Sequence, residues 1–458
     1  MRTDRCHLRT DRSREKTLKN KGIRPSSSAL LATHLGDIVL VVGRHTFVLG
    51  GYQSDFARNL AREGLGIDAL VRETVEGALE DCALDARDVA VVHVGNAFGE
   101  LFTGQAQLGA MPATVCAGLW GAPSSRHEAA CASGSMAILA AMAEIEAERY
   151  ECALVLGVEQ ERNVPGEACA RNLGAAAWVG HEGESARYLW PHMFSRVGDA
   201  YDERYGGLRR EHLTAIARKN FDNARSNPRA QTRGWKLTDA SFAEDDQSNP
   251  RIEGRLRRHD CGQVTDGAVA ILLASERFAR EWAQRRGARL ESIPRILGWG
   301  HRSAGLGLDQ KLARAEPNDV LFPHVRQAIR EALARASVPG VHALSGIETH
   351  DCFTTTEYMA IDHFELTAPG ESWRAIEERW TERGGRTPIN PSGGLIGAGH
   401  PVGATGVRMV LDAARQVSDR AGETQVDNAR MFATLNLGGS ATTAACFVLG
   451  GVEPGASR

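Results

Sequence analysis

Short apolar runs alternate along the chain with longer segments that have helical spacing. Residues 46–51 and 89–94 are short runs rich in apolar and β-branched side chains, which predicts buried strands. Between them, residues 68–82 carry apolar side chains three and four positions apart, as an amphipathic helix does. An alanine-rich helix at 135–149 and an apolar strand at 152–157 continue the series. Because alternating strands and helices build βαβ units, the pattern predicts an α/β fold whose sheet is mainly parallel and covered on both faces.

The second half of the chain repeats this order. Residues 265–275 (TDGAVAILLAS) are similar to 439–449 (GSATTAACFVL), and the helix–strand stretch 131–159 is similar to 403–439. A duplicated α/β unit is the economical interpretation, and a chance likeness between generic helix–strand pairs is the alternative. The elements predicted in this part are a strand at 267–275, a helix at 325–336, a strand around 341–347, a helix at 407–417, and strands at 431–435 and 442–449.

Two segments fall outside the repeat. Residues 165–262 are rich in aromatic side chains, arginines and Asn-Pro pairs and have little periodicity, which indicates a loop domain inserted into the first half. We therefore expect an N-terminal half at 45–285 and a C-terminal half at 286–458. Residues 1–44 are expected to be a basic, disordered extension, since the first 24 residues hold nine Lys or Arg and three Asp or Glu. A targeting peptide or a misassigned start are the alternatives, although the acidic residues fit a transit sequence poorly.

Composition narrows the functional class. Of 458 residues, 42% are hydrophobic and 24% charged, which is typical of a folded protein and excludes low-complexity classes. No apolar run approaches the ~20 residues of a membrane helix. The formal net charge of −3 argues against a nucleic-acid partner. Nine scattered cysteines without a CxxC pair favour free thiols and a cytoplasmic location.

Cys131 stands in a run of small residues, AACASG, where a helix is predicted to begin. Small side chains let backbone amides approach a ligand, and a helix N-terminus favours an anion. Both effects lower the pKa of a thiol, so the pattern predicts a reactive thiolate. A structural cysteine buried among alanines is the alternative.

His400 is the single histidine of a segment that we call the glycine-rich loop, residues 390–406 (NPSGGLIGAGHPVGATG), which contains six glycines. Packing alone seldom requires so many, because each costs about 0.5–1 kcal/mol in regular structure. The loop therefore indicates a backbone shaped to hold an imidazole at a site. A phosphate loop is disfavoured because no Lys-Ser/Thr pair follows, and an isolated turn histidine is the alternative.

Two further motifs follow apolar strands. His350 and Cys352 belong to HDCF, and Gly438 belongs to NLGG. Metal binding at HDCF is disfavoured because no second ligand cluster has zinc spacing, so no metal site is predicted. In α/β proteins, ligands bind at the carboxyl ends of the strands, so side chains that directly follow a strand are candidates for an active site. Gly438 offers a bare backbone N–H to a developing oxyanion, with a simple turn as the alternative.

A cysteine and two histidines at loops of this kind are typical of acyl-transfer chemistry. The motifs resemble those of the thiolase superfamily, and within it the sterol-carrier-protein-2-type thiolases and acetyl-CoA acetyltransferases. The resemblance runs from about residue 45 to 450 and rests on EAACASGS around Cys131, HDCF, the glycine-rich loop and NLGGSA at 436–441. It implies a thiolase-like α/β fold, with two duplicated βαβ-rich halves layered α-β-α-β-α and an inserted loop domain.

The resemblance also implies an activity. A thiolase is an acyltransferase that makes or cleaves 3-ketoacyl-CoA, such as acetoacetyl-CoA, through an acyl-cysteine intermediate. Coenzyme A and acyl-CoA are then substrates, no cofactor is permanently bound, and the chain forms a homodimer or homotetramer. The alternatives are a ketoacyl or hydroxymethylglutaryl synthase of the same fold, and a noncatalytic acyl-CoA or lipid carrier.

Roles for individual residues follow from the same resemblance. Cys131 would take the acyl group, and its amide with that of Gly438 would form an oxyanion hole. His400 would accept the thiol proton and help to stabilise the enolate oxygen, and His350, where many thiolases have asparagine, would complete that second hole. Most thiolases place an acid/base cysteine where this chain has Asn436. In the sterol-carrier-type subgroup the HDCF cysteine, here Cys352, takes over that role.

No residue is assigned to coenzyme A binding. A group of basic side chains in the inserted segment could meet its phosphates, with a solvated charged face as the favoured alternative: Arg251, Arg255, Arg257 and Arg258.

Overall fold

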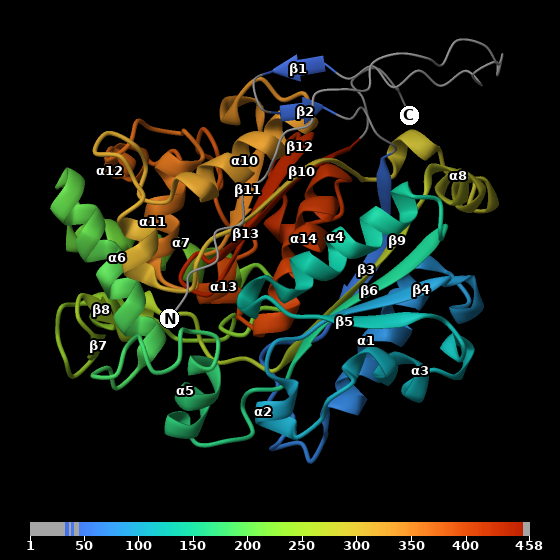
Figure 1. The fold of residues 1–458 in the computed structure, drawn as a ribbon, viewed down its shortest axis with the longest axis horizontal. Helices are drawn as coiled ribbons and strands as arrows, with labels where there is room; N and C mark the ends of the chain where they lie inside the picture. Colours follow the sequence, from blue (N-terminus) through green and yellow to red (C-terminus); the bar gives the residue numbers. More distant parts are fainter. Residues whose placement is uncertain (1–32, 36–37, 41–44, 452–458) are drawn as a thin grey trace, which may run out of the picture. The chain divides into compact units, whose positions relative to one another are not determined.

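The computed structural model describes residues 33–35, 38–40 and 45–451 (Figure 1). β1 (Thr33–Leu35) and β2 (Ile38–Leu40) form an antiparallel pair in a unit of their own. Apart from these two strands, the extension predicted for residues 1–44 lies outside the described residues. In the described ranges, no helix combines the length and the apolar character that crossing a bilayer requires.

The second unit is built on one nine-stranded mixed sheet in the order β11-β12-β13-β10-β3-β9-β6-β4-β5. Most of its strands are buried on both faces, as their continuous apolar runs predict. The strands are β3 (Thr46–Gln53), β4 (Val91–Gly95), β5 (Ser124–His127), β6 (Cys152–Glu159), β9 (Gly267–Ala274), β10 (Arg295–Ser303), β11 (Gly346–Thr349), β12 (Met431–Gly438) and β13 (Thr443–Gly450).

The strand order supports the duplication. In the first half β4 lies parallel to β6, which pairs antiparallel with β9, and β9 pairs antiparallel with β3. In the second half β11, β12, β13 and β10 follow with the same order and the same senses. The halves join where β10 pairs with β3 at Arg295 and Ile296. Since β9 and β13 take equivalent places, the similarity between residues 265–275 and 439–449 reflects a repeated unit.

The sheet is not mainly parallel, and this prediction is wrong. Five of the eight strand pairs in the described sheet are antiparallel. The reason is visible at β12 and β13, which are joined by residues 439–442. Four residues close an antiparallel turn, but they are too few for the crossover that a parallel pair needs. The strand predicted around 341–347 is also shorter: a 3₁₀ turn at Val341–Ala343 precedes β11.

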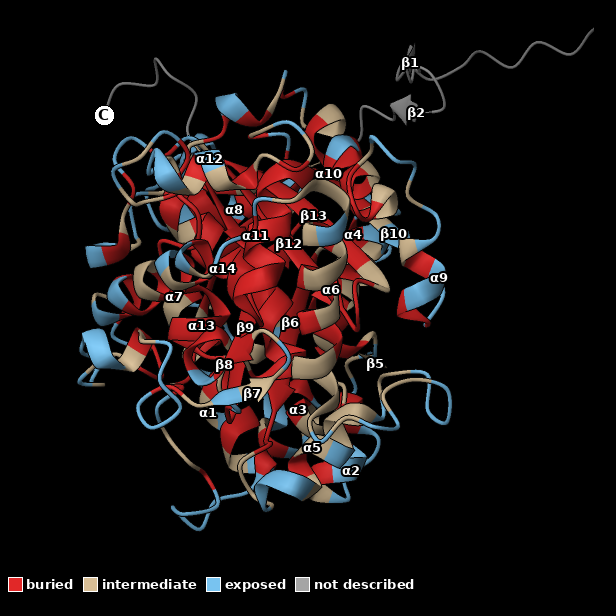
Figure 2. Ribbon diagram, turned by 90° about the vertical axis from the view of Figure 1, so that its left-hand side faces the viewer, coloured by how far each residue is buried: buried red, intermediate tan, exposed pale blue. Residues whose placement is uncertain are grey.

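The helices form layers around the sheet, and the five-layered thiolase-like prediction is confirmed. α1 (Ile67–Cys82) covers the outer side of the first half and α10 (Pro323–Arg335) that of the second. α4 (Ser133–Glu146) and α14 (Thr405–Val417) lie between the two half-sheets and touch each other (Figure 1). α14 is buried almost throughout, and the red centre of Figure 2 shows this middle layer as the core. Shorter peripheral helices are α2 (Gly99–Thr103), α3 (Met111–Val115), α8 (Glu276–Arg285), α9 (Leu308–Leu312) and α12 (Ser372–Glu377).

The inserted segment, in which the sequence shows little periodicity, contains helices and a β-hairpin. Within residues 165–262 lie α5 (Gly166–Gly174), α6 (Leu189–Tyr205), α7 (Arg210–Arg225), and the hairpin of β7 (Arg251–Glu253) and β8 (Leu256–Arg257). α6 and α7 pack against α11 (Thr354–His363), which directly follows the HDCF motif. In α7 the buried positions Leu213, Ile216, Ala217, Asn220 and Phe221 do have helical spacing, but charged residues between them hid the period.

The N-terminal ends of the two central helices, α4 and α14, contact each other through glycines. A Cβ atom added to Gly134, near the start of α4, would lie 2.8 Å from the carbonyl oxygen of Gly403, just before α14. A Cβ added to Gly157 in β6 would lie 2.6 Å from the same oxygen. Real Cβ atoms do not approach backbone this closely, so the layer tolerates no side chain at either position.

Gly134→Ala is therefore expected to destabilise the fold by about 1–3 kcal/mol, because the new methyl group meets backbone that cannot move aside. The matched control is Gly384→Ala, where an added Cβ meets nothing within 4 Å. Chemical denaturation of both variants measures the free energy of unfolding. Equal midpoints for the two would contradict the close contact.

Candidate active site

Cys131 lies in a tight turn that leads into α4. The turn is a 3₁₀ segment, Ala130–Ala132, in which Ala130 has a φ of 50°. An alanine in this left-handed region is strained and persists only where the surroundings hold it. Ser133 supplies the restraint, since its Oγ donates to the carbonyl oxygen of Ala130 at 2.6 Å and accepts the N–H of Ala129 at 2.9 Å. The turn directs the thiol away from the helix.

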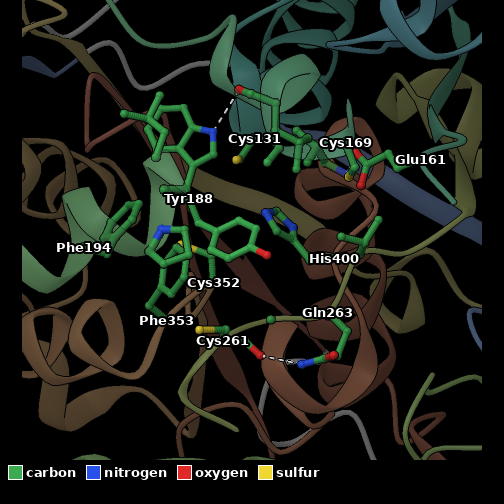
Figure 3. A pocket seen from close by; sticks show the side chains of 18 of the residues that line it. Cys131, Glu161, Cys169, Tyr188, Phe194, Cys261, Gln263, Cys352, Phe353 and His400 are labelled. Carbon is green, nitrogen blue, oxygen red and sulfur yellow. Dashed lines mark hydrogen bonds between the residues drawn. The ribbon is translucent and has the colours of Figure 1, made fainter. Parts of the chain in front are cut away.

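The thiol opens into a pocket of about 360 Å³, which we call the central pocket (Figure 3). Cys352 and His400 open into it as well. The wall facing them comes from α6 and the chain before it, with Tyr188 and Phe194. The lining is otherwise mostly apolar, so charges that develop inside are poorly shielded by water.

His350 and His400 stand beside Cys131. His350 directly follows β11, and His400 follows α13 (Gly394–Ala398) in the glycine-rich loop. The thiol sulfur and one ring nitrogen of each histidine all lie within 4.8 Å of one another. The rings are nearly perpendicular, with centroids 5.4 Å apart. The fold thus brings together residues that are separated by up to 269 positions in the chain.

Hydrogen bonds set the tautomer of His400. Its Nδ1 lies 2.7 Å from Oγ1 of Thr405, and that hydroxyl donates its proton to the carbonyl oxygen of Pro401 at 3.0 Å. Nδ1 must therefore carry the hydrogen and donate to Thr405. Nε2 keeps its lone pair and can accept a proton. Burial, and then the charge of Arg408, lower the pKa of His400 to about 3, so the ring is neutral at rest.

His350 has the opposite tautomer. Asn436 accepts a hydrogen bond from Oγ of Ser135 at 2.8 Å, and its Nδ2 donates to Nδ1 of His350 at 3.2 Å. Nδ1 is thus the acceptor, and the ring hydrogen lies on Nε2. That nitrogen is buried and has no hydrogen-bond partner in the structure. A buried, unpaired N–H at this place can donate to an oxygen that carries developing negative charge.

Cys352 is the second thiol of the site. It follows β11 by three residues, is buried, and lies 3.7 Å from the hydroxyl of Thr356. Burial, and then the proximity of Cys131, raise the pKa of its thiol well above the ordinary value. The group is therefore a neutral thiol that holds a proton inside the central pocket.

Cys131 is also a neutral thiol, contrary to the thiolate predicted from its sequence context. Burial, and then the nearby carboxyl of Glu161, raise its pKa to about 12, although the N–H groups of Gly439 and of Cys131 itself favour the anion. The helix terminus is present, but removal from water outweighs it. The glycine N–H that lies at the Cys131 sulfur belongs to Gly439. The preceding residue, Gly438, packs against Ala129.

The loop after β12 is anchored by Lys311, a residue that the sequence did not single out. Lys311 belongs to the short helix α9 and is buried. Its Nζ donates to the hydroxyls of Ser440 at 2.8 Å and Thr442 at 2.9 Å. Burial lowers its pKa to about 8. Nothing in the polar sequence around Lys311 indicated burial, because its partners lie about 130 residues away. Asn436 and Thr405 do lie within the sequence motifs, but the sequence did not indicate the hydrogen bonds that they form with the two histidines.

The four arginines of the inserted segment have different surroundings. Arg255 forms an ion pair with Asp199 at 2.7 Å, and the buried Arg257 pairs with Asp246 at 2.6 Å. Arg251 is exposed. Only Arg258 lines the central pocket, and within residues 45–451 it has no ion-pair partner. The charged-face interpretation therefore does not fit the buried Arg257, whereas Arg258 is exposed and also lines the pocket.

Family models match both parts of the chain. The thiolase N-terminal domain model matches residues 46–233, and the thiolase C-terminal domain-like model matches residues 308–451. An acetyl-CoA acetyltransferase of Methanothermobacter thermautotrophicus is 30% identical over 383 residues, which cover 83% of this chain and 93% of that protein. Human sterol carrier protein 2 is 27% identical, over 90% of this chain and 74% of its own. Among solved structures, an Ltp2–ChsH2(DUF35) aldolase is similar with a TM-score of 0.71 and 21% identity, covering 90% of this chain and all of that one.

The neutral state of Cys131 predicts how its alkylation depends on pH. Because the pKa is raised to about 12, the thiolate fraction should increase about tenfold per pH unit from pH 6 to 10. The rate of iodoacetamide labelling, followed by peptide mass spectrometry, should increase with it. His400, whose pKa is lowered to about 3, adds no inflection in this range. A labelling rate that stops increasing below pH 8 would contradict a neutral Cys131 thiol beside a neutral His400. The Cys131→Ala variant measures the background labelling of the other cysteines.

Proposed function

This chain belongs to the thiolase family, and on that premise we propose that it is an acyl-CoA C-acyltransferase. It makes or cleaves 3-ketoacyl-CoA, such as acetoacetyl-CoA, through an acyl group held on Cys131. The observation that carries the proposal is the pairing of opposite histidine tautomers around one thiol. A ring nitrogen with a free lone pair and a ring N–H without a partner lie next to Cys131. Acyl transfer needs one proton acceptor and one oxyanion donor at this place.

The first step of cleavage is attack by the Cys131 sulfur on the 3-keto carbon. As the C–S bond forms, Nε2 of His400 accepts the thiol proton. The negative charge on the keto oxygen is met by backbone N–H groups, for which the amides of Cys131, Gly438 and Gly439 are the candidates. Because the resting thiol is neutral, the proton moves during the attack, and no exposed thiolate has to be maintained.

The second step breaks the bond between the second and third carbons. Its electron pair passes to the thioester of the departing acetyl-CoA, where Nε2–H of His350 and the now protonated Nε2 of His400 stabilise the enolate oxygen. Cys352 gives its proton to the carbon and is restored afterwards by proton exchange. The thiol of a second coenzyme A then attacks the acyl-Cys131 thioester, and the shortened acyl-CoA leaves. Synthesis follows the same steps in reverse.

Coenzyme A reaches the site as a substrate in this proposal, with no resident cofactor. Arg258 is the candidate for its phosphates, because it is a cation at the central pocket without an ion-pair partner within the described part of the chain. A homodimer or homotetramer and a cytoplasmic location complete the proposal. They rest on the family and on cysteines that form no disulfide among the eight that the structure describes.

The direct test is covalent. Incubation with acetoacetyl-CoA or acetyl-CoA should leave one acyl group on Cys131, seen in the intact mass and located by peptide mapping. Thiolysis of acetoacetyl-CoA should require added coenzyme A, and Cys131→Ala should abolish both signals. Binding of acyl-CoA without an adduct or turnover would overturn the proposal in favour of a carrier.

Cys352→Ala separates the two half-reactions. Loss of the proton donor should slow thiolysis of acetoacetyl-CoA by about 10²–10⁴-fold. Exchange of the acetyl group between acetyl-CoA and Cys131 breaks no carbon–carbon bond and should be affected far less. Cys261→Ala, which removes another thiol of the same pocket, is the matched control. An equal loss of both reactions in Cys352→Ala would contradict its role as acid.

A further inference from the structure

A buried carboxyl group in the wall of the central pocket has no part in the reaction described above. Glu161 stands two residues after the end of β6, is 1% exposed, and lines the same pocket as Cys131 and His400. In Figure 3 its side chain lies beside Cys169, on the same side of the pocket as His400. Proton transfer is already assigned to His400 and Cys352, and oxyanion binding to His350 and backbone amides.

Glu161 differs from the two acidic residues nearest to it. Glu159 accepts the N–H groups of Ala97, Phe98 and Gly403 at 2.9–3.0 Å and so ties two loops together. Asp266 accepts three backbone N–H groups at 2.8–3.0 Å. Glu161 receives the N–H of Val402 at a long 3.3 Å, and the N–H of Thr265 approaches it. No cation pairs with it within residues 45–451. The fold therefore leaves hydrogen-bonding capacity of this carboxyl unused.

The charge state of Glu161 follows from these neighbours. Burial, and then the carboxyl of Glu159, raise its pKa well above the ordinary value, and Asp266 acts in the same direction. This shift favours the protonated, neutral form of the carboxyl group. It can therefore donate through its O–H and accept through its other oxygen.

On the pocket side, the wall beside Glu161 is mostly apolar. Phe98, Cys169 and Val402 form a small hydrophobic cluster on this side of the pocket, with Leu173 packed against it. A methionine or leucine would fill such a place without the penalty of burying a polar group that is incompletely paired. In binding pockets, a few polar groups among apolar ones fix the orientation and identity of a ligand.

We propose that Glu161 makes the central pocket selective for acyl groups that carry a hydroxyl or carbonyl oxygen on an otherwise apolar chain. The carboxylic acid exchanges hydrogen bonds with that oxygen. The oxygen lies beyond the 3-keto group, whose own oxygen is taken by the backbone amides during attack. This inference rests on the proposed acyltransferase function and names its substrate class.

The test compares matched substrates. Pairs of 3-ketoacyl-CoA thioesters of equal chain length, one plain and one with a hydroxyl moved stepwise along the chain, are assayed for thiolysis. At the matching position the wild type should favour the hydroxylated member by about 10–100-fold in kcat/KM, because the plain chain leaves a buried polar group without its hydrogen-bond partner. Glu161→Gln keeps a neutral donor and acceptor and should retain the preference. Glu161→Met should reduce the ratio to about one.

Three outcomes would overturn the inference. The wild type could use both members of every pair equally, Glu161→Met could slow both members by the same factor, or Glu161→Gln could abolish both reactions. The second result assigns Glu161 a structural role, and the third an acid–base role. Thermal unfolding of both variants shows whether they fold.

A binding measurement keeps this test separate from the proposed function. Calorimetric titration of Cys131→Ala with the same paired thioesters reports selectivity without turnover. If the wild type forms no acyl adduct but Cys131→Ala still prefers the hydroxylated thioester, the proposed function fails and the selectivity stands. If the adduct forms but neither binding nor turnover distinguishes the pair, the inference alone fails.

Discussion

The N-terminal ends of α4 and α14 pack against each other, and this contact sets the positions of the active-site residues that precede the two helices. Gly134 and Gly157 leave no room for a side chain against the carbonyl oxygen of Gly403, so the two helices approach as closely as their backbones allow. Cys131 precedes one helix and His400 precedes the other. A wider separation of the helices would move the thiol away from its base, and for this reason the packing of the middle layer and the chemistry of the site are linked.

Buried polar groups hold the loops around this contact. Glu159 accepts N–H groups from the loop after β4 and from Gly403, and Asp351 accepts those of Leu395 and Ile396 at the start of α13. Arg408 in α14 donates to Ser392 and Asp412 at 2.7–2.8 Å. Groups of this kind are costly to bury. Several hydrogen bonds satisfy the two carboxyl groups, whereas Arg408 donates through Nη1 and its buried Nε and Nη2 have no hydrogen-bond partner. These groups restrain loops that have little apolar packing of their own.

The two histidines show how one residue type takes different roles in one pocket. Thr405 holds the hydrogen of His400 on Nδ1, whereas Asn436 leaves that of His350 on Nε2. Burial keeps both rings and both thiols neutral. The resting site therefore has few charges, and in a medium of low dielectric constant any charge that forms on a substrate is strongly felt by the donors around it. Asn436 thereby keeps a function at the position where most thiolases have a cysteine.

Local patterns were enough to predict the α/β class and to identify the four motifs that meet in the central pocket, because helical and strand periods and runs of glycine are local properties. They favoured a duplication, which the strand order then supported. Except at 341–347, the strands and helices that these patterns predicted lie within a few residues of those in the structure, but β5, β10 and most of the shorter helices were not predicted. Only the folded structure shows four further features: the antiparallel pairing, the helices α6 and α7, the anchoring by Lys311 and the buried acid at Glu161. The same holds for the pKa of Cys131, for which the local helix terminus predicted a thiolate. Each of these features depends on which distant residues are brought together and on how completely water is removed from them. The residues around a single motif do not determine either of these two conditions.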